Sequence, residues 1–137
     1  MDRILMDTHI IVDLVLSGTR HKDDVLDKIE NSRNTNSLFI SSITLWEIAM
    51  LVSKKRIEVY KPMLEFLEEI SNIDGLSVVD INPKIASESV LLNDFHPDPS
   101  DRIIVETARV MNVTLITRDS KIISWNNENR LIRVIEG

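Results

Sequence analysis

Short apolar segments alternate with amphipathic helical segments along the whole of this 137-residue chain. The helical segments place apolar residues three and four positions apart, which is typical of helices that pack on one side. The short segments consist mainly of residues that favour buried strands, and they lie at 3–6, 38–41, 76–81, 114–117 and 131–135. We therefore predict an α/β fold in which one domain spans residues 1–137. Its sheet is mainly parallel, has about five strands and is covered by helices on both faces.

Local signals set the expected ends of the helices. Thr8 can cap a helix that begins at His9, and Asn82-Pro83 and Asp98-Pro99 are typical of helix starts. Asp74-Gly75 predicts a turn before the third strand. The remaining helices are expected at about 22–30, 44–54, 62–70 and 99–111, with a short helical turn near 122.

Composition excludes several classes of protein. The chain has no cysteine, so it forms no disulfide, thiolate nucleophile or cysteine zinc site. With only three glycines it lacks the loops of nucleotide-binding proteins. No apolar run is long enough to cross a membrane, and we expect a cytoplasmic protein that does not contact membrane. The net charge of −6 argues mildly against a nucleic-acid partner, although two bound divalent cations would offset about four of those charges.

Four acidic residues fall where predicted strands end or helices begin. Asp7 ends the first strand and Asp119 follows the fourth, while Glu47 and Asp101 lie early in two helices. If the sheet has the common doubly wound order, strands one and four are neighbours and their carboxyl ends meet at the ligand-binding edge. Carboxylates gathered there would repel one another unless cations neutralised them, and Mg²⁺ or Mn²⁺ prefers such oxygen ligands. The sequence therefore indicates a divalent-metal site.

Each acid also has a local structural explanation. Thr44-Leu45-Trp46-Glu47 fits a capping box, in which Glu47 would serve only the helix start. Asp98 is the better cap of the pair Asp98 and Asp101. Asp119 could simply initiate a turn, and Asp7 could end a strand without binding anything.

Other candidate residues give weaker signals. His9, His21 and His96 are the possible nitrogen ligands of a metal, and the role of His9 stays open. Arg102 and Arg118 adjoin the candidate acids, so we expect them to contact phosphate. The aromatic residues do not form a spaced series for base stacking, and core packing is their expected use.

Four sequence blocks together resemble PIN-domain proteins, and in particular the VapC-type toxins of prokaryotic toxin–antitoxin pairs. The blocks are Leu5-Met6-Asp7-Thr8-His9, Ser41-Ser42-Ile43-Thr44-Leu45-Trp46-Glu47-Ile48, Asp98-Pro99-Ser100-Asp101-Arg102-Ile103-Ile104-Val105-Glu106-Thr107-Ala108 and Leu115-Ile116-Thr117-Arg118-Asp119. They occur in the order typical of the family and span nearly the full chain. His9 departs from the Asn or Ser that the family often has there.

The resemblance implies a four-acid site formed by Asp7, Glu47, Asp101 and Asp119. Thr117 would support it through a hydroxyl, and we place Thr8 and Asp98 in the same supporting group. The resemblance also implies Mg²⁺-dependent cleavage of RNA, with Mn²⁺ able to substitute, as well as homodimerisation and inhibition by a small cognate antitoxin.

Bound metal can activate water and stabilise charge on phosphoryl oxygens, which agrees with phosphodiester hydrolysis. We expect Asp7, Asp101 and Asp119 to bind metal, with Glu47 binding a second ion or orienting the attacking water. Two alternatives stay open. One is a non-catalytic PIN-like interaction module, and the other is a receiver-like or phosphatase-like domain with Asp80 as phosphoryl acceptor.

Overall fold

The computed structural model describes residues 2–16, 21–92 and 98–137. Its five strands form one sheet in the order β3-β2-β1-β4-β5, and every pairing is parallel. The strands are β1 (Ile4–Met6), β2 (Leu38–Ser41), β3 (Leu76–Val79), β4 (Thr114–Thr117) and β5 (Val134–Glu136). The predicted α/β fold is confirmed, with β1 in the centre and β4 beside it. Because β2 and β3 extend to one side of β1 and β4 and β5 to the other, the order reverses between β1 and β4.

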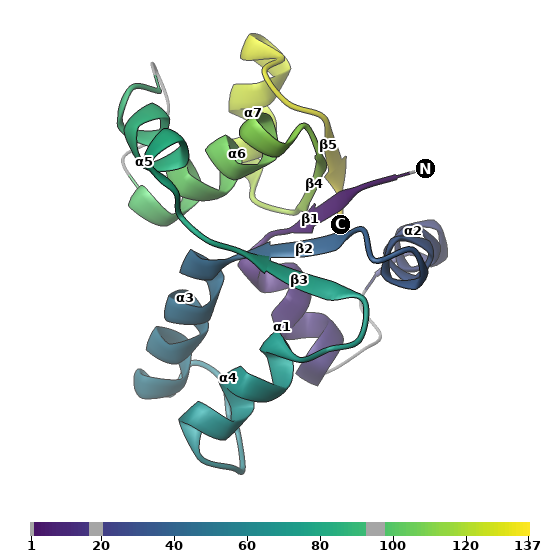
Figure 1. Ribbon diagram of the computed structural model, residues 1–137, viewed down its shortest axis with the longest axis vertical. Coiled ribbons are helices and arrows are strands. Elements are labelled where there is room, and N and C mark those ends of the chain that lie inside the picture. Colours follow the sequence, from purple (N-terminus) through teal and green to yellow (C-terminus); the bar gives the residue numbers. More distant parts are fainter. Residues whose placement is uncertain (1, 17–20, 93–97) are drawn as a thin grey trace.

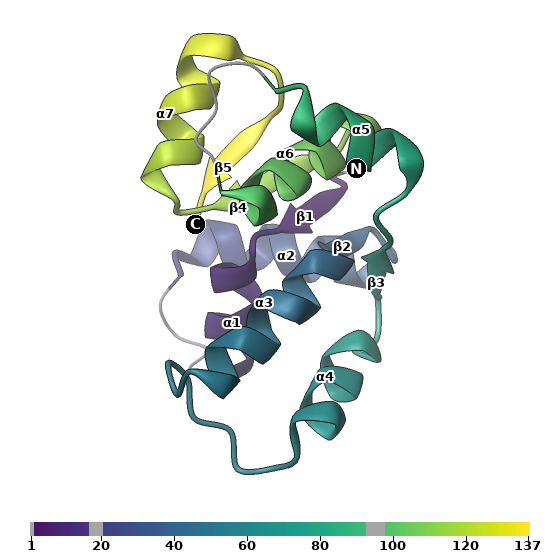
Figure 2. The ribbon, with the colours of Figure 1, turned by 90° about the vertical axis from the view of Figure 1, so that its left-hand side faces the viewer.

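Seven helices lie within the described residues and cover both faces of the sheet (Figures 1 and 2). They are α1 (Thr8–Leu16), α2 (Asp23–Asn34), α3 (Ser42–Ser53), α4 (Met63–Ser71), α5 (Pro83–Val90), α6 (Pro99–Met111) and α7 (Ser120–Asn129). None of these helices combines the length and apolar character needed to cross a bilayer.

Alternate residues of the central strand β1 pack into two separate hydrophobic cores. Ile4 and Met6 are fully buried in a cluster with residues of α1, α2, α3 and α4. Leu5 between them is buried on the opposite face, with residues of α6 and α7. Helix α5 packs against α6 on that second side, as Figure 1 shows. Burial on both faces explains why the strand is apolar throughout, and it leaves the strand ends as the place for polar groups.

Several predicted boundaries were wrong, including the end of α2, which continues to Asn34, and three of them have a local reason. Residues 131–133 do not belong to the last strand, because the Asn126 side chain donates to the carbonyl of Ile132 and accepts from its N–H, which ties this segment to α7. The third strand ends at Val79 because Asn82 already caps α5 through the N–H of Ile85. The helical turn expected near 122 is a ten-residue helix that buries Trp125.

Candidate active site

The register of β1 and β4 places Asp7 beside Thr117. Met6 pairs with Ile116, and the Asp7 N–H donates to the Ile116 carbonyl at 3.0 Å, so the ladder continues past the end of β1. The Thr117 hydroxyl then donates to Oδ2 of Asp7 at 2.6 Å. Both side chains are buried, with 4% of Asp7 and none of Thr117 exposed. The carboxylate of Asp7 is thus fixed at the strand end where the sheet order reverses.

The start of α1 fixes the other oxygen of the same carboxylate. Oδ1 of Asp7 accepts from the Thr8 N–H at 2.8 Å, and the helix begins at Thr8. The prediction that Thr8 caps a helix starting at His9 was therefore wrong, because Asp7 takes the N-terminal N–H. This leaves the buried Thr8 hydroxyl available to contact α3.

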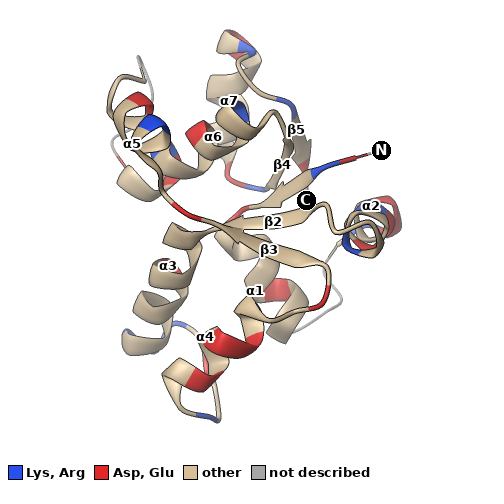
Figure 3. Cartoon of the chain, viewed as in Figure 1, with Lys and Arg blue, Asp and Glu red and all other residues tan. Residues whose placement is uncertain are grey.

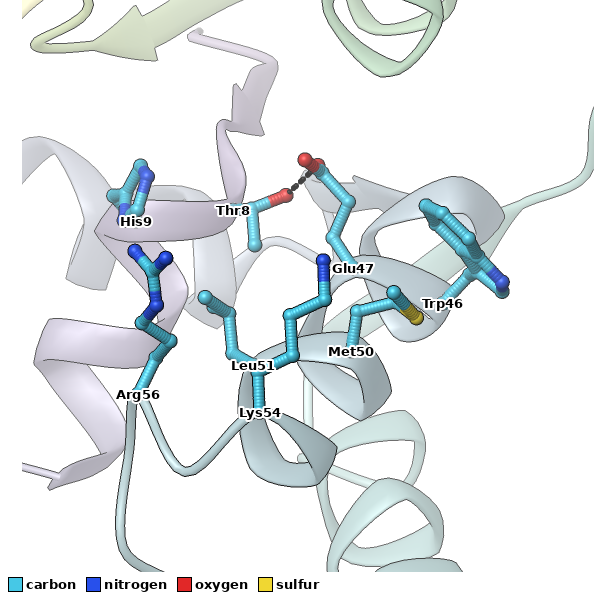
Figure 4. Close-up of a pocket in the computed structure, with 8 residues that line it drawn as sticks. All are labelled: Thr8, His9, Trp46, Glu47, Met50, Leu51, Lys54 and Arg56. Atoms are coloured by element: carbon cyan, nitrogen blue, oxygen red, sulfur yellow. Dashed lines mark hydrogen bonds between the residues drawn. The ribbon is translucent and has the colours of Figure 1, made fainter.

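Glu47 faces Thr8 across the gap between α1 and α3. The Thr8 hydroxyl donates to Oε1 of Glu47 at 2.5 Å (Figure 4). The same hydroxyl lies 3.0 Å from the Thr44 hydroxyl. The capping box was wrong, since α3 starts at Ser42 and its cap is Ser41, whose side chain accepts from the Ile43 N–H. Because α3 starts earlier than predicted, Glu47 lies in its second turn and its carboxylate is directed at the end of β1.

Asp98 caps helix α6, as the sequence predicted, and Asp101 does not. Asp98 is the N-cap of α6, and its side chain accepts from the Ser100 N–H at 3.0 Å. Asp101 follows in the first turn and is 8% exposed. The N-terminal end of a helix carries positive partial charge, which favours an anion there.

Asp119 both caps a helix and contributes charge to the acidic cluster. It caps α7 by accepting from the Lys121 N–H at 2.8 Å, while its own N–H donates to the Thr117 hydroxyl at 3.0 Å. Thr117 therefore joins Asp7 and Asp119 through one oxygen. The turn predicted at Asp119 is present, and it does not separate this residue from the other acids.

The pKa of Asp101 reflects how closely the acids gather. Burial raises the pKa of its carboxyl, and the charges of Asp7, Asp98, Asp119 and Glu47 raise it further, to about 8 from an ordinary value of 3.8. Four acids thus act on one carboxyl group, and three of them, Asp7, Glu47 and Asp119, come from distant parts of the sequence. Such crowding is unfavourable for the chain alone and is typical of a functional site.

The pKa values of Asp7 and Glu47 shift in the same direction. Burial raises the pKa of Asp7, against the effect of the Thr117 hydrogen bond and the charge of His9, both of which lower it. Burial also raises the pKa of Glu47, which the hydrogen bond from Thr8 partly offsets. His9 is exposed at the start of α1 and favours the ionised form of both acids.

The donor set fits a divalent cation in its chemistry. Oxygen ligands with several negative charges are what Mg²⁺ and Mn²⁺ require, and a cation would relieve the repulsion that raises the Asp101 pKa. Across 2–16, 21–92 and 98–137, no three acids or histidines are already positioned to coordinate one ion. Anions without a cation repel one another, and coordination of one ion by three of these acids would require their carboxylates to lie closer together than they do here.

Both arginines predicted to contact phosphate have partners within the protein. Nη1 of Arg102 donates to the carbonyls of Ser89 and Leu92, both at 3.1 Å, and thereby joins α6 to the end of α5. Arg118 forms an ion pair with Asp13 of α1. Phosphate contact by either residue stays a prediction, and it would compete with these interactions.

Asp80 and His21 are not among the acids and contacts that form this cluster. Asp80 is exposed just after the edge strand β3 and is not among the acids that act on Asp101. His21 is buried before α2, and His96 lies outside the described residues. Sequence reasoning missed Thr44 and Asp13, whose roles depend on contacts between segments far apart in the chain.

A pocket of about 250 Å³ opens beside Glu47, between the start of α1 and the exposed side of α3 (Figure 4). It is lined by Thr8, His9, Trp46, Glu47, Met50, Leu51, Lys54 and Arg56.

The model of the PIN domain matches residues 4–125. The chain belongs to the PIN-domain family. Over 123 residues it is 28% identical to ribonuclease VapC22 of Mycobacterium tuberculosis, with 89% of this chain and 91% of that protein covered. The four sequence blocks that resembled VapC-type toxins thus indicated the correct family.

Solved structures of toxin–antitoxin complexes have the same fold. The VapBC2 complex of Rickettsia felis, bound to promoter DNA, matches with a TM-score of 0.69 at 21% identity and covers 97% of both chains. A toxin–antitoxin complex from Klebsiella pneumoniae matches with a TM-score of 0.59 at 27% identity, over 86% of this chain and 88% of that one. At 21% identity, the similarity to the Rickettsia felis complex shows the shared fold and no more.

Proposed function

We propose that this protein is a Mg²⁺-dependent endoribonuclease and the toxin of a type II toxin–antitoxin pair. The main support is the gathering of acids at one end of the sheet, where the Thr117 hydroxyl joins Asp7 and Asp119. The raised pKa of Asp101, caused by burial and by the charges of four other acids, agrees with this arrangement. A site of this kind needs divalent cations before it can accept a polyanionic substrate. The similarity to a VapC ribonuclease supports RNA as that substrate.

Asp7, Asp101 and Asp119 would hold the cation, and Glu47 would bind a second ion or orient the attacking water. When bound, Mg²⁺ supplies Lewis-acid stabilisation of the phosphoryl oxygens and lowers the pKa of bound water. Thr117 and Thr8 position two of the carboxylates by donating hydrogen bonds to Asp7 and Glu47. In the hydrolysis, water adds to phosphorus, the bond to the ribose oxygen breaks, and that oxygen gains a proton.

Asp7→Asn tests the proposal directly. The amide keeps the size of the carboxyl group but removes its charge, so Mg²⁺-dependent cleavage of single-stranded RNA should be abolished while the protein stays folded. Asp80→Asn is the matched control, because Asp80 is exposed and outside the cluster. Full cleavage by the Asp7 variant would overturn the assignment.

The proposal also includes a small antitoxin partner and a homodimer. Solved relatives are toxin–antitoxin complexes, and several large apolar side chains of this chain are exposed, including Leu64, Val90 and Leu91 at 67–74%. Apolar surface of this kind is common where proteins associate. Light scattering on the purified protein should give twice the chain mass, and a monomer at all concentrations would contradict the dimer.

A non-catalytic interaction module is the remaining alternative. It predicts weak or absent Mg²⁺ binding, which calorimetry distinguishes from the metal site proposed here. The receiver-like alternative lacks support, because Asp80 is exposed at the sheet edge and the chain belongs to the PIN family.

A further inference from the structure

The pocket beside Glu47 combines aromatic and cationic side chains on one side of α3. Trp46, Met50 and Lys54 follow one another at intervals of four residues, which places them in a row along the helix. Glu47 and Leu51 form the adjoining row with the same spacing. Since an α-helix rises about 1.5 Å per residue, the first row extends roughly 12 Å from Trp46 to Lys54.

The other walls of the pocket come from α1 and from the segment that follows α3. In Figure 4 the Lys54 ammonium group points into the space below Glu47, and Arg56 extends toward His9 on the opposite side. The Trp46 indole lies at the far end beside Met50. The pocket therefore has Arg56 at one end, the Trp46 ring at the other, and the Lys54 ammonium group near the candidate catalytic acid Glu47 between them.

Two features of these side chains favour a ligand over a structural role. Trp46 is 56% exposed and belongs to neither core, whereas Trp125 is 8% exposed and lies in a core. Lys54 and Arg56 form no ion pair within the described part of the chain, although Arg33, Lys61 and Arg109 are each paired with glutamate. Figure 3 shows this basic segment at the C-terminal end of α3 in a chain that is acidic overall.

We propose that this pocket is a nucleotide subsite that holds the single-stranded RNA next to the bond being cleaved. This proposal rests on the function proposed above. A base would stack on Trp46, with Met50 completing the apolar surface, and an adjacent phosphate would lie against Lys54 and Arg56. Stacking on an aromatic side chain tolerates any base, and cations contribute by neutralising phosphates. Lys54 and Arg56 would attract either RNA or an acidic protein segment, and the exposed indole of Trp46, on which a base can stack, favours RNA.

The subsite gives the acidic site a means of attracting its substrate. The catalytic acids alone would repel RNA, and the two cations beside Glu47 supply positive charge that does not depend on bound metal. The subsite would therefore contribute to KM and to binding, whereas the acids would determine kcat.

Binding is best measured separately from cleavage. The Asp7→Asn protein with Trp125→Phe retains a single tryptophan, Trp46, whose fluorescence should be quenched when a short single-stranded oligoribonucleotide binds. Trp46→Ala in the Asp7→Asn background should weaken binding of the same RNA, labelled with a fluorophore, about 5- to 100-fold. A set of RNA probes, each with one abasic site at a different position, should show reduced affinity for one position only. In the Trp46→Ala protein, the abasic site at that position should no longer reduce affinity.

The cations predict a different signature. Lys54→Gln and Arg56→Gln should each weaken binding and reduce the slope of log K against log salt by about 0.7, the value for one phosphate on a single strand. Lys55→Gln is the matched control, since Lys55 is exposed, has the same charge and does not line the pocket. In the protein with Asp7 intact, these pocket variants should raise KM with little change in kcat.

The results separate this proposal from the proposed function. If the unmodified protein cleaves RNA and the Trp46, Lys54 and Arg56 variants bind and cleave like Lys55→Gln, the subsite is wrong and the nuclease assignment stands. If those variants lose only binding to a protein partner, the pocket is a protein-docking surface and the subsite is again wrong. If the unmodified protein neither binds nor cleaves RNA, the proposed function itself fails.

Discussion

Thr117 donates its hydroxyl hydrogen to Oδ2 of Asp7 at 2.6 Å, although the two residues are 110 positions apart in the sequence. The same hydroxyl oxygen accepts from the N–H of Asp119 at 3.0 Å. One buried side chain thus fixes two of the proposed metal ligands at the ends of adjacent parallel strands. Its position follows from the register of β1 and β4, so the site depends directly on the order of the sheet.

Replacing Thr117 with Val should affect both stability and activity. Valine has the same shape but cannot donate to Asp7 or accept from Asp119, so it leaves buried polar groups without partners. The free energy of unfolding should fall by about 1–3 kcal/mol, and the pKa of Asp7 should rise further because the hydrogen bond lowers it now. Denaturant unfolding and RNA cleavage measure the two effects. Thr117→Ser keeps the hydroxyl and should retain most activity; equal loss in both variants would argue against this role.

Without metal, stability should decrease as pH rises. The pKa of Asp101 is about 8 in the folded protein and near its ordinary value of 3.8 when unfolded, so the folded state binds the proton more tightly. The free energy of unfolding therefore falls between about pH 4 and about pH 8, and it does not fall further above that range.

Asp101→Asn should remove most of this pH dependence. Near pH 7.5 the metal-free variant should be more stable than the unmodified protein by about 1–3 kcal/mol, since it lacks the buried charge. Thermal unfolding in a chelator across the pH range gives the comparison. A protein whose stability increases steadily over this range would contradict the crowding of acids around Asp101.

Glu47→Gln should impair the site without weakening the fold. The amide oxygen can still accept from the Thr8 hydroxyl, so the contact between α1 and α3 is retained while the charge is lost. Metal affinity or cleavage should fall at least about 10- to 100-fold with an unchanged melting temperature. Glu65→Gln on the exposed side of α4 removes the same charge far from the cluster and should change neither quantity.

Much of the fold could be predicted because periodicity and strand composition report burial directly. Val, Ile and Leu in short segments indicated a sheet buried on both faces, and β4 was correctly placed beside β1. The errors came from contacts between distant segments. Thr8 was expected to cap its own helix, yet its hydroxyl contacts Glu47, which lies 39 positions away.

The candidate site was predictable in its residues and less so in its environment. Acids at strand ends could be identified from sequence, since parallel strands bring those ends to one edge. The ion pair of Arg118 with Asp13 and the bonds from Arg102 to the end of α5 could not, because exposed cations look alike in a sequence whatever they contact. Trp46 was expected to pack in a core, but its exposed position on α3 makes that expectation wrong.

The proposed metal site can be tested by a calorimetric titration with Mn²⁺ at neutral pH in two buffers of different ionisation enthalpy. Because the Asp101 pKa is about 8, the carboxyl is largely protonated before the ion binds, so binding should release a proton to the buffer. We predict that the unmodified protein and Asp80→Asn bind Mn²⁺ and release a proton. Asp101→Asn should show neither Mn²⁺ binding nor proton release. Absence of Mn²⁺ binding, or binding of equal strength without proton release in all three proteins, would contradict the account.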